Sequence, residues 1–173
     1  SCKTPVMSCS ALRYAGETRM LRRGKTGAGR ILTGYSTGRE ALRGLIYYGI
    51  HALELLYSIV GPGIRSVQNI GTRGKNTLIL RYRDGRRFIV SSYRDVAVTF
   101  EITLYGTEGS ASVTVTNADA YYSGMLRSFV EMVKTGREPF PHNETLEIIQ
   151  TLVLAERSRK RKGGVMTLKE TEV

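Results

Sequence analysis

Long apolar runs are absent from this sequence of 173 residues. No run approaches the roughly 18 apolar residues that a membrane-spanning helix needs, so we expect no membrane segment. The opening residues, 1–10, also lack the charged and then apolar pattern of a secretory signal peptide. These absences favour a cytoplasmic protein, and a hydrophobic content of 41% is enough to form the packed core of a single domain.

Cysteine is scarce, with only Cys2 and Cys9 near the start of the chain. Their C-x6-C spacing matches no zinc-binding pattern, and no second cysteine pair or histidine cluster completes one. We therefore expect two reduced thiols and no metal site.

Nucleotide-binding and hydrolase motifs are also missing. No G-x-G-x-x-G sequence opens a helix after a strand, and the glycines at 24–29 lie in a basic loop. The segment Gly24-Lys25-Thr26 is similar to the end of a P-loop, but Arg19 stands where the earlier glycine is needed. Without H-E-x-x-H, G-x-S-x-G or a carboxylate pair, the chain is expected to bind no cofactor alone and to hold no complete active site.

Acidic residues are few, with 15 Asp and Glu against 26 Lys and Arg, which gives a net charge of +11. Such a charge is compatible with nucleic acid, a membrane surface or an anionic substrate. The densest basic run, 157–162, falls at the end of a predicted helix, where cations suit the helix dipole. No nucleic-acid-binding motif accompanies it, so a polyanion-binding basic domain is kept only as an alternative.

The hydrophobic pattern predicts an α+β fold with an open, predominantly antiparallel sheet and helices packed on one face. Asp84-Gly85 between two alternating stretches indicates a hairpin, and 106–109 forms the turn of a second one. Asn143 is the expected N-cap of the last helix. Strands are predicted at 6–8, 30–37, 66–70, 77–82, 87–92, 96–105, 110–116 and 165–168, and helices at 17–23, 45–60, 121–134 and 144–160.

Alternation along the predicted strands gives the sheet one apolar face. Its expected members are Leu78, Leu80, Tyr82, Val96, Val98, Phe100, Ile102, Leu104, Ala111, Val113 and Val115. The opposite face is rich in Thr, Ser, Arg and Tyr. It is either plain solvent surface or an association surface left free for oligomerisation.

One helix, 45–60, carries the only constellation suited to catalysis. Tyr47, His51, Glu54 and Ser58 are spaced four, three and four residues apart and are predicted to share one stripe. His51 is the candidate proton shuttle, Glu54 could orient it, and Tyr47 could hydrogen-bond to a substrate hydroxyl. A histidine on a polar helix face is more often simply solvated, and the spacing alone does not assign it a catalytic role.

Several stretches together resemble the C-terminal domain of the Gfo/Idh/MocA family of NAD(P)-dependent oxidoreductases. The matching segments are Pro5-Val6-Met7-Ser8 with Leu12-Arg13-Tyr14, Gly49-Ile50-His51-Ala52-Leu53-Glu54, Lys134-Thr135-Gly136-Arg137-Glu138-Pro139, and Glu144-Thr145-Leu146-Glu147-Ile148 with Ala155-Glu156-Arg157-Ser158. The resemblance implies that 1–15 is the end of a Rossmann domain with its linker and that 16–173 is the C-terminal α+β domain. The glycine loop and the E-K-P lysine of the family's Rossmann domain are not among these residues.

The resemblance also implies a substrate-binding and oligomerisation domain that is not active alone. NAD or NADP, a sugar or polyol substrate, a homo-oligomer formed through the sheet, and a Rossmann domain outside these residues are implied with it. His51 aligns with the family's relay histidine, whereas Tyr47 stands where the family has Asp, and a phenol with a pKa near 10 cannot replace a resting carboxylate. Arg13, Tyr14 and Glu54 are the candidate substrate contacts. A non-enzymatic association module remains the alternative of a different class.

Overall fold

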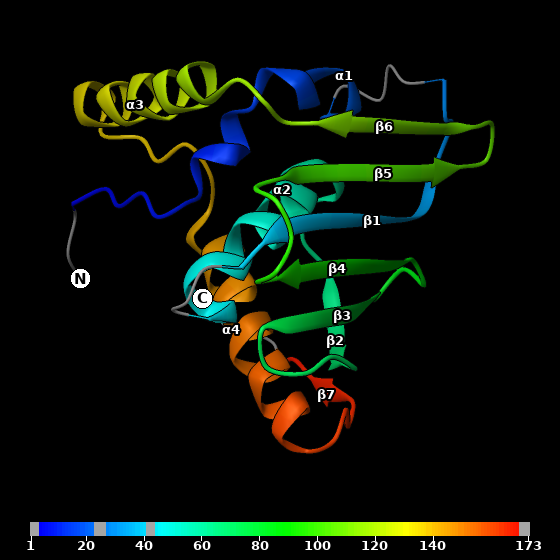
Figure 1. Cartoon of the computed structure of the whole chain (residues 1–173). Coiled ribbons are helices and arrows are strands. Elements are labelled where there is room, and N and C mark those ends of the chain that lie inside the picture. The colour runs from blue at the N-terminus through cyan, green and yellow to red at the C-terminus, as the bar shows by residue number, and fades with distance from the viewer. Residues whose placement is uncertain (1–3, 23–26, 41–43, 170–173) are drawn as a thin grey trace.

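The computed structural model describes residues 4–22, 27–40 and 44–169. Its centre is a seven-stranded sheet in the order β6-β5-β1-β4-β3-β2-β7, with helices on one side (Figure 1). The strands are β1 (Ile31–Arg39), β2 (Ile64–Asn69), β3 (Lys75–Tyr82), β4 (Arg87–Tyr93), β5 (Phe100–Gly106), β6 (Ser110–Thr114) and β7 (Met166–Thr167). The α-helices are α1 (Arg19–Arg22), α2 (Ile50–Val60), α3 (Ala118–Thr135) and α4 (His142–Lys160). Two 3-10 turns, η1 (Ala11–Tyr14) and η2 (Gly16–Thr18), precede α1.

The sheet is mixed but mostly antiparallel, as the sequence predicts. Both hairpins form: β3 pairs with β4 across the Asp84-Gly85 turn, and β5 pairs with β6. The first strand, β1, lies between these hairpins, antiparallel to β5 and parallel to β4. Gly34 of β1 makes this close pairing possible, since a Cβ there would lie 2.4 Å from the carbonyl oxygen of Thr103.

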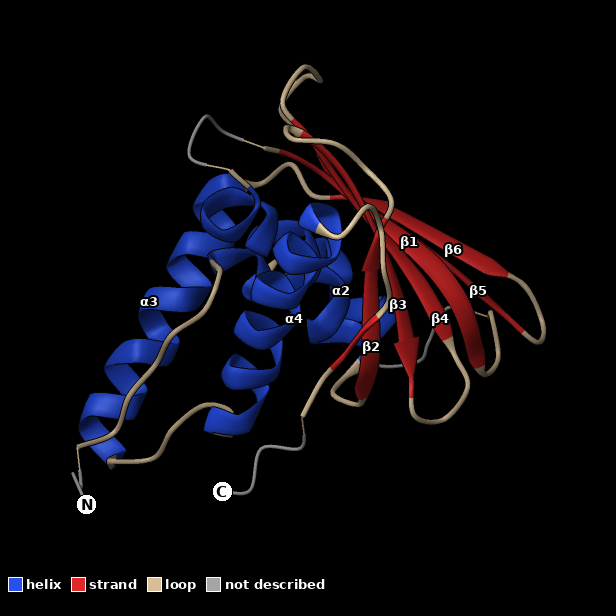
Figure 2. Ribbon diagram, turned by 90° about the horizontal axis from the view of Figure 1, so that it is seen from below, coloured by secondary structure: helices blue, strands red, loops and turns tan. Residues whose placement is uncertain are grey.

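The helices all lie on one side of the sheet, and the other side is bare (Figure 2). α2 packs over β1, β4 and β5, while α4 lies along β2 and β7. α3 is different, because it packs mainly against η1 at the start of the domain rather than on the sheet. The predicted α+β class, with one face covered and one face free, is confirmed.

The main core is formed between the helix layer and the covered sheet face. Predicted positions Leu78, Leu80, Ile102 and Leu104 are fully buried there. Val98 is a correction: β5 begins only at Phe100, so Val98 lies outside the strand and is 67% exposed. Other large members of the core cluster include Leu45, Leu53, Leu55, Leu56, Tyr57, Ile64, Val67, Tyr82, Phe88, Val90, Ile148 and Leu152.

Other predictions fail at the ends of elements. The segment 6–8 forms no strand, because it has no strand partner. Instead the Val6 N–H donates to the Glu138 carboxylate, and the Ser8 carbonyl accepts the hydroxyl of Thr145. α4 begins one residue before Asn143, at His142, so Asn143 is inside the helix and Pro141 is the N-cap residue. The predicted helix 17–23 is divided into the 3-10 turn η2 and the four-residue α1, and residue 23 lies outside the described residues. The predictions for Cys2 and for 24–26 lie outside the described residues.

Within the described ranges, every helix is too short or too polar to cross a membrane. The same residues contain no group of His, Cys, Asp or Glu arranged to hold a metal ion.

Candidate functional site

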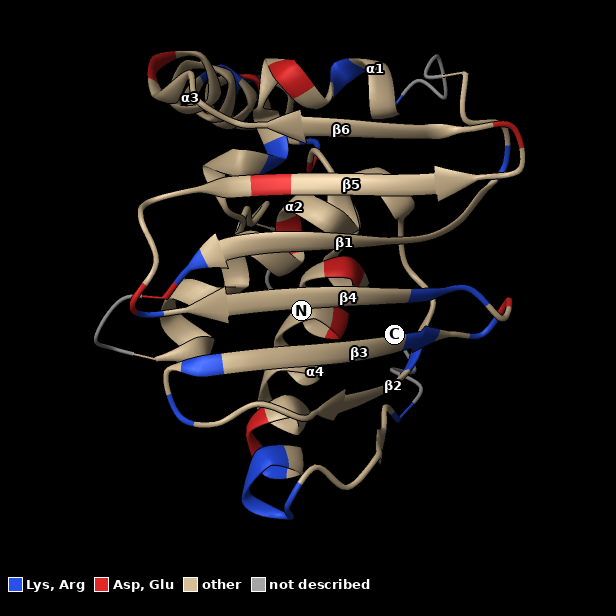
Figure 3. Cartoon of the chain, turned by 45° about the vertical axis from the view of Figure 1, so that its right-hand side comes forward, with Lys and Arg blue, Asp and Glu red and all other residues tan. Residues whose placement is uncertain are grey.

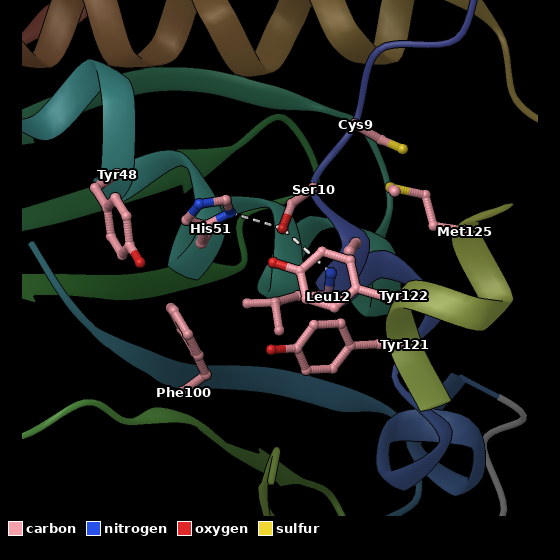
Figure 4. A pocket seen from close by; sticks show the side chains of 10 residues that line it. Cys9, Ser10, Leu12, Tyr48, His51, Phe100, Tyr121, Tyr122 and Met125 are labelled. Atoms are coloured by element: carbon pink, nitrogen blue, oxygen red, sulfur yellow. Dashed lines mark hydrogen bonds between the residues drawn. The ribbon is translucent and has the colours of Figure 1, made fainter. Parts of the chain in front are cut away.

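A pocket of about 230 Å³ opens where the N-terminal segment, the start of α2 and the first turns of α3 meet (Figure 4). It lies on the helix side of the molecule, with Phe100 of β5 at its base. The residues around it are Cys9, Ser10, Ala11, Leu12, Tyr48, His51, Phe100, Tyr121, Tyr122 and Met125. None of them is an acidic residue, a lysine or an arginine, so the pocket suits an uncharged ligand.

Ser10 links the N-terminal segment to α2. Its hydroxyl oxygen accepts the backbone N–H of Leu12 at 3.2 Å, which caps η1, and it lies 2.8 Å from Nδ1 of His51. The cap fixes the position of the hydroxyl, because a serine at this position satisfies an otherwise free helix N–H. The imidazole is therefore held by a group that is itself fixed in place.

His51 is packed between two aromatic rings. The ring of Tyr48 lies edge-on to it at a centroid distance of 4.9 Å, and that of Phe100 at 5.9 Å. Burial among these rings lowers the pKa of His51 below its ordinary value, since desolvation disfavours the imidazolium. The imidazole is thus neutral near pH 7 and can accept a proton.

A π-helical turn, Leu45–Gly49, precedes α2 and changes which tyrosine is near His51. A π turn is wider than an α turn, so a constant advance of 100° per residue fails across it. As a result Tyr48 lines the pocket, while Tyr47 is 56% exposed and is not among the lining residues. The prediction that Tyr47 shares one helix face with His51 and Glu54 is therefore wrong for Tyr47.

Glu54 lies behind the pocket rather than on an open polar face, with only 1% of its surface exposed. Its carboxylate accepts the Ser10 N–H at 2.7 Å and pairs with Nε of Arg13 at 3.0 Å. Arg13 also donates to Glu144 of α4 at 2.7 Å and lies over the ring of Phe140. Burial raises the pKa of Glu54, and the Ser10 amide and Arg13 oppose this rise.

Tyr14 anchors α3, which provides one wall of the pocket. Its hydroxyl donates to Oγ of Ser128 at 2.9 Å. Gly124 lets the helix approach η1, because a Cβ at this position would lie 2.9 Å from Cβ of Tyr14. α3 thereby presents Tyr121 and Tyr122 to the pocket, with ring centroids 4.9 Å apart.

Of the residues predicted from the sequence, only His51 lines this pocket. Arg13, Tyr14 and Glu54 make internal contacts next to it, and these contacts hold its walls. The lining side chains that sequence reasoning missed come from separate segments of the chain: Ser10, Tyr48, Phe100, Tyr121, Tyr122 and Met125. Ser10, three residues before Arg13, has the capping character that could have drawn attention to it, but no local pattern joins these segments.

The described part of the chain contains no Rossmann-type dinucleotide site. The Rossmann site needs a parallel sheet with a glycine-rich turn at a helix N-terminus. Here only β1 and β4 run parallel, and no such turn connects them.

The architecture matches known solved structures over most of its length. Myo-inositol dehydrogenase from Lactobacillus casei, in complex with NAD(H) and myo-inositol, superposes with a TM-score of 0.79 at 13% identity, over 98% of this chain and 64% of that one. Myo-inositol dehydrogenase from Corynebacterium glutamicum superposes with a TM-score of 0.78 at 15% identity, over 93% of this chain and 64% of that one. GenD2 from gentamicin A biosynthesis, in complex with NAD, superposes with a TM-score of 0.77 at 16% identity, over 92% of this chain and 62% of that one.

The fold is that of the C-terminal domain of Gfo/Idh/MocA-type dehydrogenases. The chain spans less than two thirds of the length of these structures. At such low identity, the likeness of this C-terminal-domain fold establishes architecture and not activity. No family model matches the sequence, and no curated protein matches it either.

Proposed function

We propose that these residues are the substrate-binding and self-association domain of an NAD(P)-dependent oxidoreductase that acts on a polyol or sugar. The observation that carries the proposal is a neutral histidine, fixed by Ser10, in an uncharged pocket lined with aromatic rings. Aromatic rings offer flat apolar surfaces, and hydroxyl groups on the tyrosines and Ser10 offer donors and acceptors. This combination suits a neutral, hydroxyl-rich ring.

His51 is assigned the role of proton acceptor from a substrate hydroxyl. When Nδ1 carries the proton and donates to Oγ of Ser10, the other ring nitrogen is free to accept. The lowered pKa of His51 keeps the ring in this receptive form near neutral pH. Arg13 and Glu54 are positioning residues, since Glu54 binds the Ser10 N–H that sets the hydroxyl in place.

The cofactor belongs to a dinucleotide-binding domain outside these residues. NAD(P) would supply hydride transfer, and the present chain would supply substrate orientation and proton removal. The solved structures support this division, because about a third of each lies beyond the part that this chain matches. Tyr47 is proposed to have no part in the proton transfer, since Tyr48 takes the place beside His51.

Self-association is proposed for the bare sheet face. Tyr35, Ile89 and Tyr105 lie on it, exposed by 40%, 43% and 44%. Apolar side chains of this size on an otherwise polar sheet suit an interface more than a solvent surface. Sedimentation equilibrium tests this directly: we expect a dimer or larger assembly, and a strict monomer at high concentration would contradict it.

The substrate proposal is tested by titrating the chain with myo-inositol while the histidine resonances are followed by NMR. We expect saturable shifts of the His51 signals and none for His142, which is the first residue of α4. In a full-length enzyme that contains this chain, His51→Ala should lower turnover by about 10²-fold. Unchanged turnover would leave His51 as a packing residue, and a clear titration with NAD(H) by this chain alone would contradict the division of roles.

A further inference from the structure

Three arginines gather at one corner of the bare sheet face, far from the pocket. Arg81 of β3 and Arg87 of β4 are direct cross-strand partners, about 5 Å apart at their Cα atoms. Arg65 stands on the next strand, β2, at a shift in register between Ile64 and Ser66. Figure 3 shows the basic ends of β3 and β4 side by side at this corner.

This arrangement is unfavourable unless something offsets it. Like charges directly opposite each other on neighbouring strands destabilise a sheet. None of Arg65, Arg81 and Arg87 forms an ion pair with a described residue. Arg86, one residue away, shows the contrast, since Asp84 binds its Nε at 2.7 Å.

A groove of about 340 Å³ lies between these arginines, and no acidic residue lines it. Its other lining residues include the hydroxyl-bearing Ser66 and Thr167, which are partners in the β2–β7 pairing. Arg81 donates through Nη2 to Gln68 at 3.0 Å, but its Nη1 is buried and has no partner among the described residues. Leaving a buried guanidinium N–H without an acceptor costs free energy. A ligand bound in the groove could supply that acceptor.

We propose that Arg65, Arg81 and Arg87 form a binding site for a small phosphate-bearing anion. Guanidinium groups bind phosphate oxygens through paired N–H donors, and three of them suit a multiply charged group better than a single carboxylate. Ser66 and Thr167 add hydroxyl groups to the lining of the groove. The groove is larger than one phosphate, so it fits pyrophosphate or a phosphate ester. The site lies on the opposite side of the sheet from the His51 pocket and does not depend on the function proposed for that pocket.

Isothermal titration calorimetry with sodium pyrophosphate, at an ionic strength held constant with sodium chloride, tests the proposal. We expect saturable binding of one pyrophosphate per chain, weaker binding of inorganic phosphate, and none of acetate. Arg81→Gln and Arg87→Gln should each weaken binding by about tenfold, the loss of one charged hydrogen-bonding group. Arg87→Lys should restore part of it, because the charge remains but the paired donors are lost.

Arg39→Gln is the matched control, because Arg39 ends β1 at the far end of the same sheet. This variant should bind pyrophosphate as the unchanged protein does. Equal weakening by Arg39→Gln would mean attraction by net charge alone and would overturn the proposal, as would the absence of saturable heat.

Sedimentation of the same variants and titration with an oligonucleotide cover two other outcomes. Dissociation of an oligomer by Arg81→Gln without any anion binding would make the groove a contact between copies. An oligonucleotide that binds more tightly than pyrophosphate would make it part of a nucleic-acid surface. Either result would overturn the proposal.

Discussion

Nδ1 of His51 lies 2.8 Å from Oγ of Ser10, although the two residues are 41 positions apart in the chain. The contact joins α2 to the N-terminal segment that precedes the sheet. Ser10 is fixed twice, by the cap of η1 through Leu12 and by its own N–H to Glu54. The position of the imidazole therefore depends on a buried polar network as well as on aromatic packing.

The pH dependence of stability should report on His51. Because its pKa is lowered in the folded protein, the unfolded chain takes up the proton more readily. This contribution to the free energy of unfolding is fully present above about pH 6.5 and is lost as the pH falls below it. Urea unfolding between about pH 7.5 and 5.5 measures the slope. His51→Gln should flatten that slope, and an unchanged slope in the variant would contradict the assignment.

Removal of Arg13 should destabilise the fold strongly. Arg13→Met leaves the buried carboxylate of Glu54 without its cation, and we expect a loss of about 3 kcal/mol in the free energy of unfolding. The double variant Arg13→Met with Glu54→Met should recover part of this loss, because no buried charge is then left unpaired. Denaturant titration of the unchanged protein, of Arg13→Met and Glu54→Met singly, and of the double variant gives the coupling energy.

The pair Lys75 and Asp95 is the comparison for that experiment. Their side chains are 61% and 57% exposed, so water screens the charges. Lys75→Met should change stability little, although its N–O distance of 2.6 Å is shorter than the 3.0 Å between Arg13 and Glu54. A loss as large as that of Arg13→Met would show that distance rather than burial decides the energy.

Docking of α3 should depend on Gly124. Gly124→Val places a side chain where Cβ alone would already lie 2.9 Å from Tyr14, so the helix must move away from η1. Hydrogen exchange measured by mass spectrometry should show faster exchange along α3 and little change in the sheet. Arg127→Val, at an exposed position of the same helix, is the control for helix propensity. Equal effects of the two variants would argue against the close contact.

Asn76 should be essential to a second buried network. Its amide donates to Glu40 at 2.6 Å and accepts from Asn69 at 2.8 Å. Asn76→Leu leaves both partners without this bond, and we expect a loss of about 3 kcal/mol. Thr77→Val removes one partly buried hydrogen bond, to Tyr93 on the bare face, and should cost about 1 kcal/mol. Thermal and chemical unfolding of the two variants would show whether this difference exists.

Local patterns in the sequence were sufficient for most elements. Asp84-Gly85 specifies its hairpin because Gly85 adopts a φ of 89°, which few other residues tolerate. Alternation predicted the buried positions of β3 and the inner half of β5, since side chains alternate between sheet faces. It overextended β5 to Val96 and Val98, where apolar residues continue the pattern but no strand pairs with them.

The sequence by itself determined the α+β class, the two hairpins, the covered and bare faces of the sheet, and His51 as the candidate proton carrier. These follow from short-range periodicity and from turn residues, which act within a few positions. Only the tertiary structure decided that β1 enters between β4 and β5, that the π turn brings Tyr48 rather than Tyr47 to His51, and that Glu54 is buried against Arg13. The physical reason is that pairing across strands, helix register and burial depend on contacts between distant segments, which no local pattern encodes.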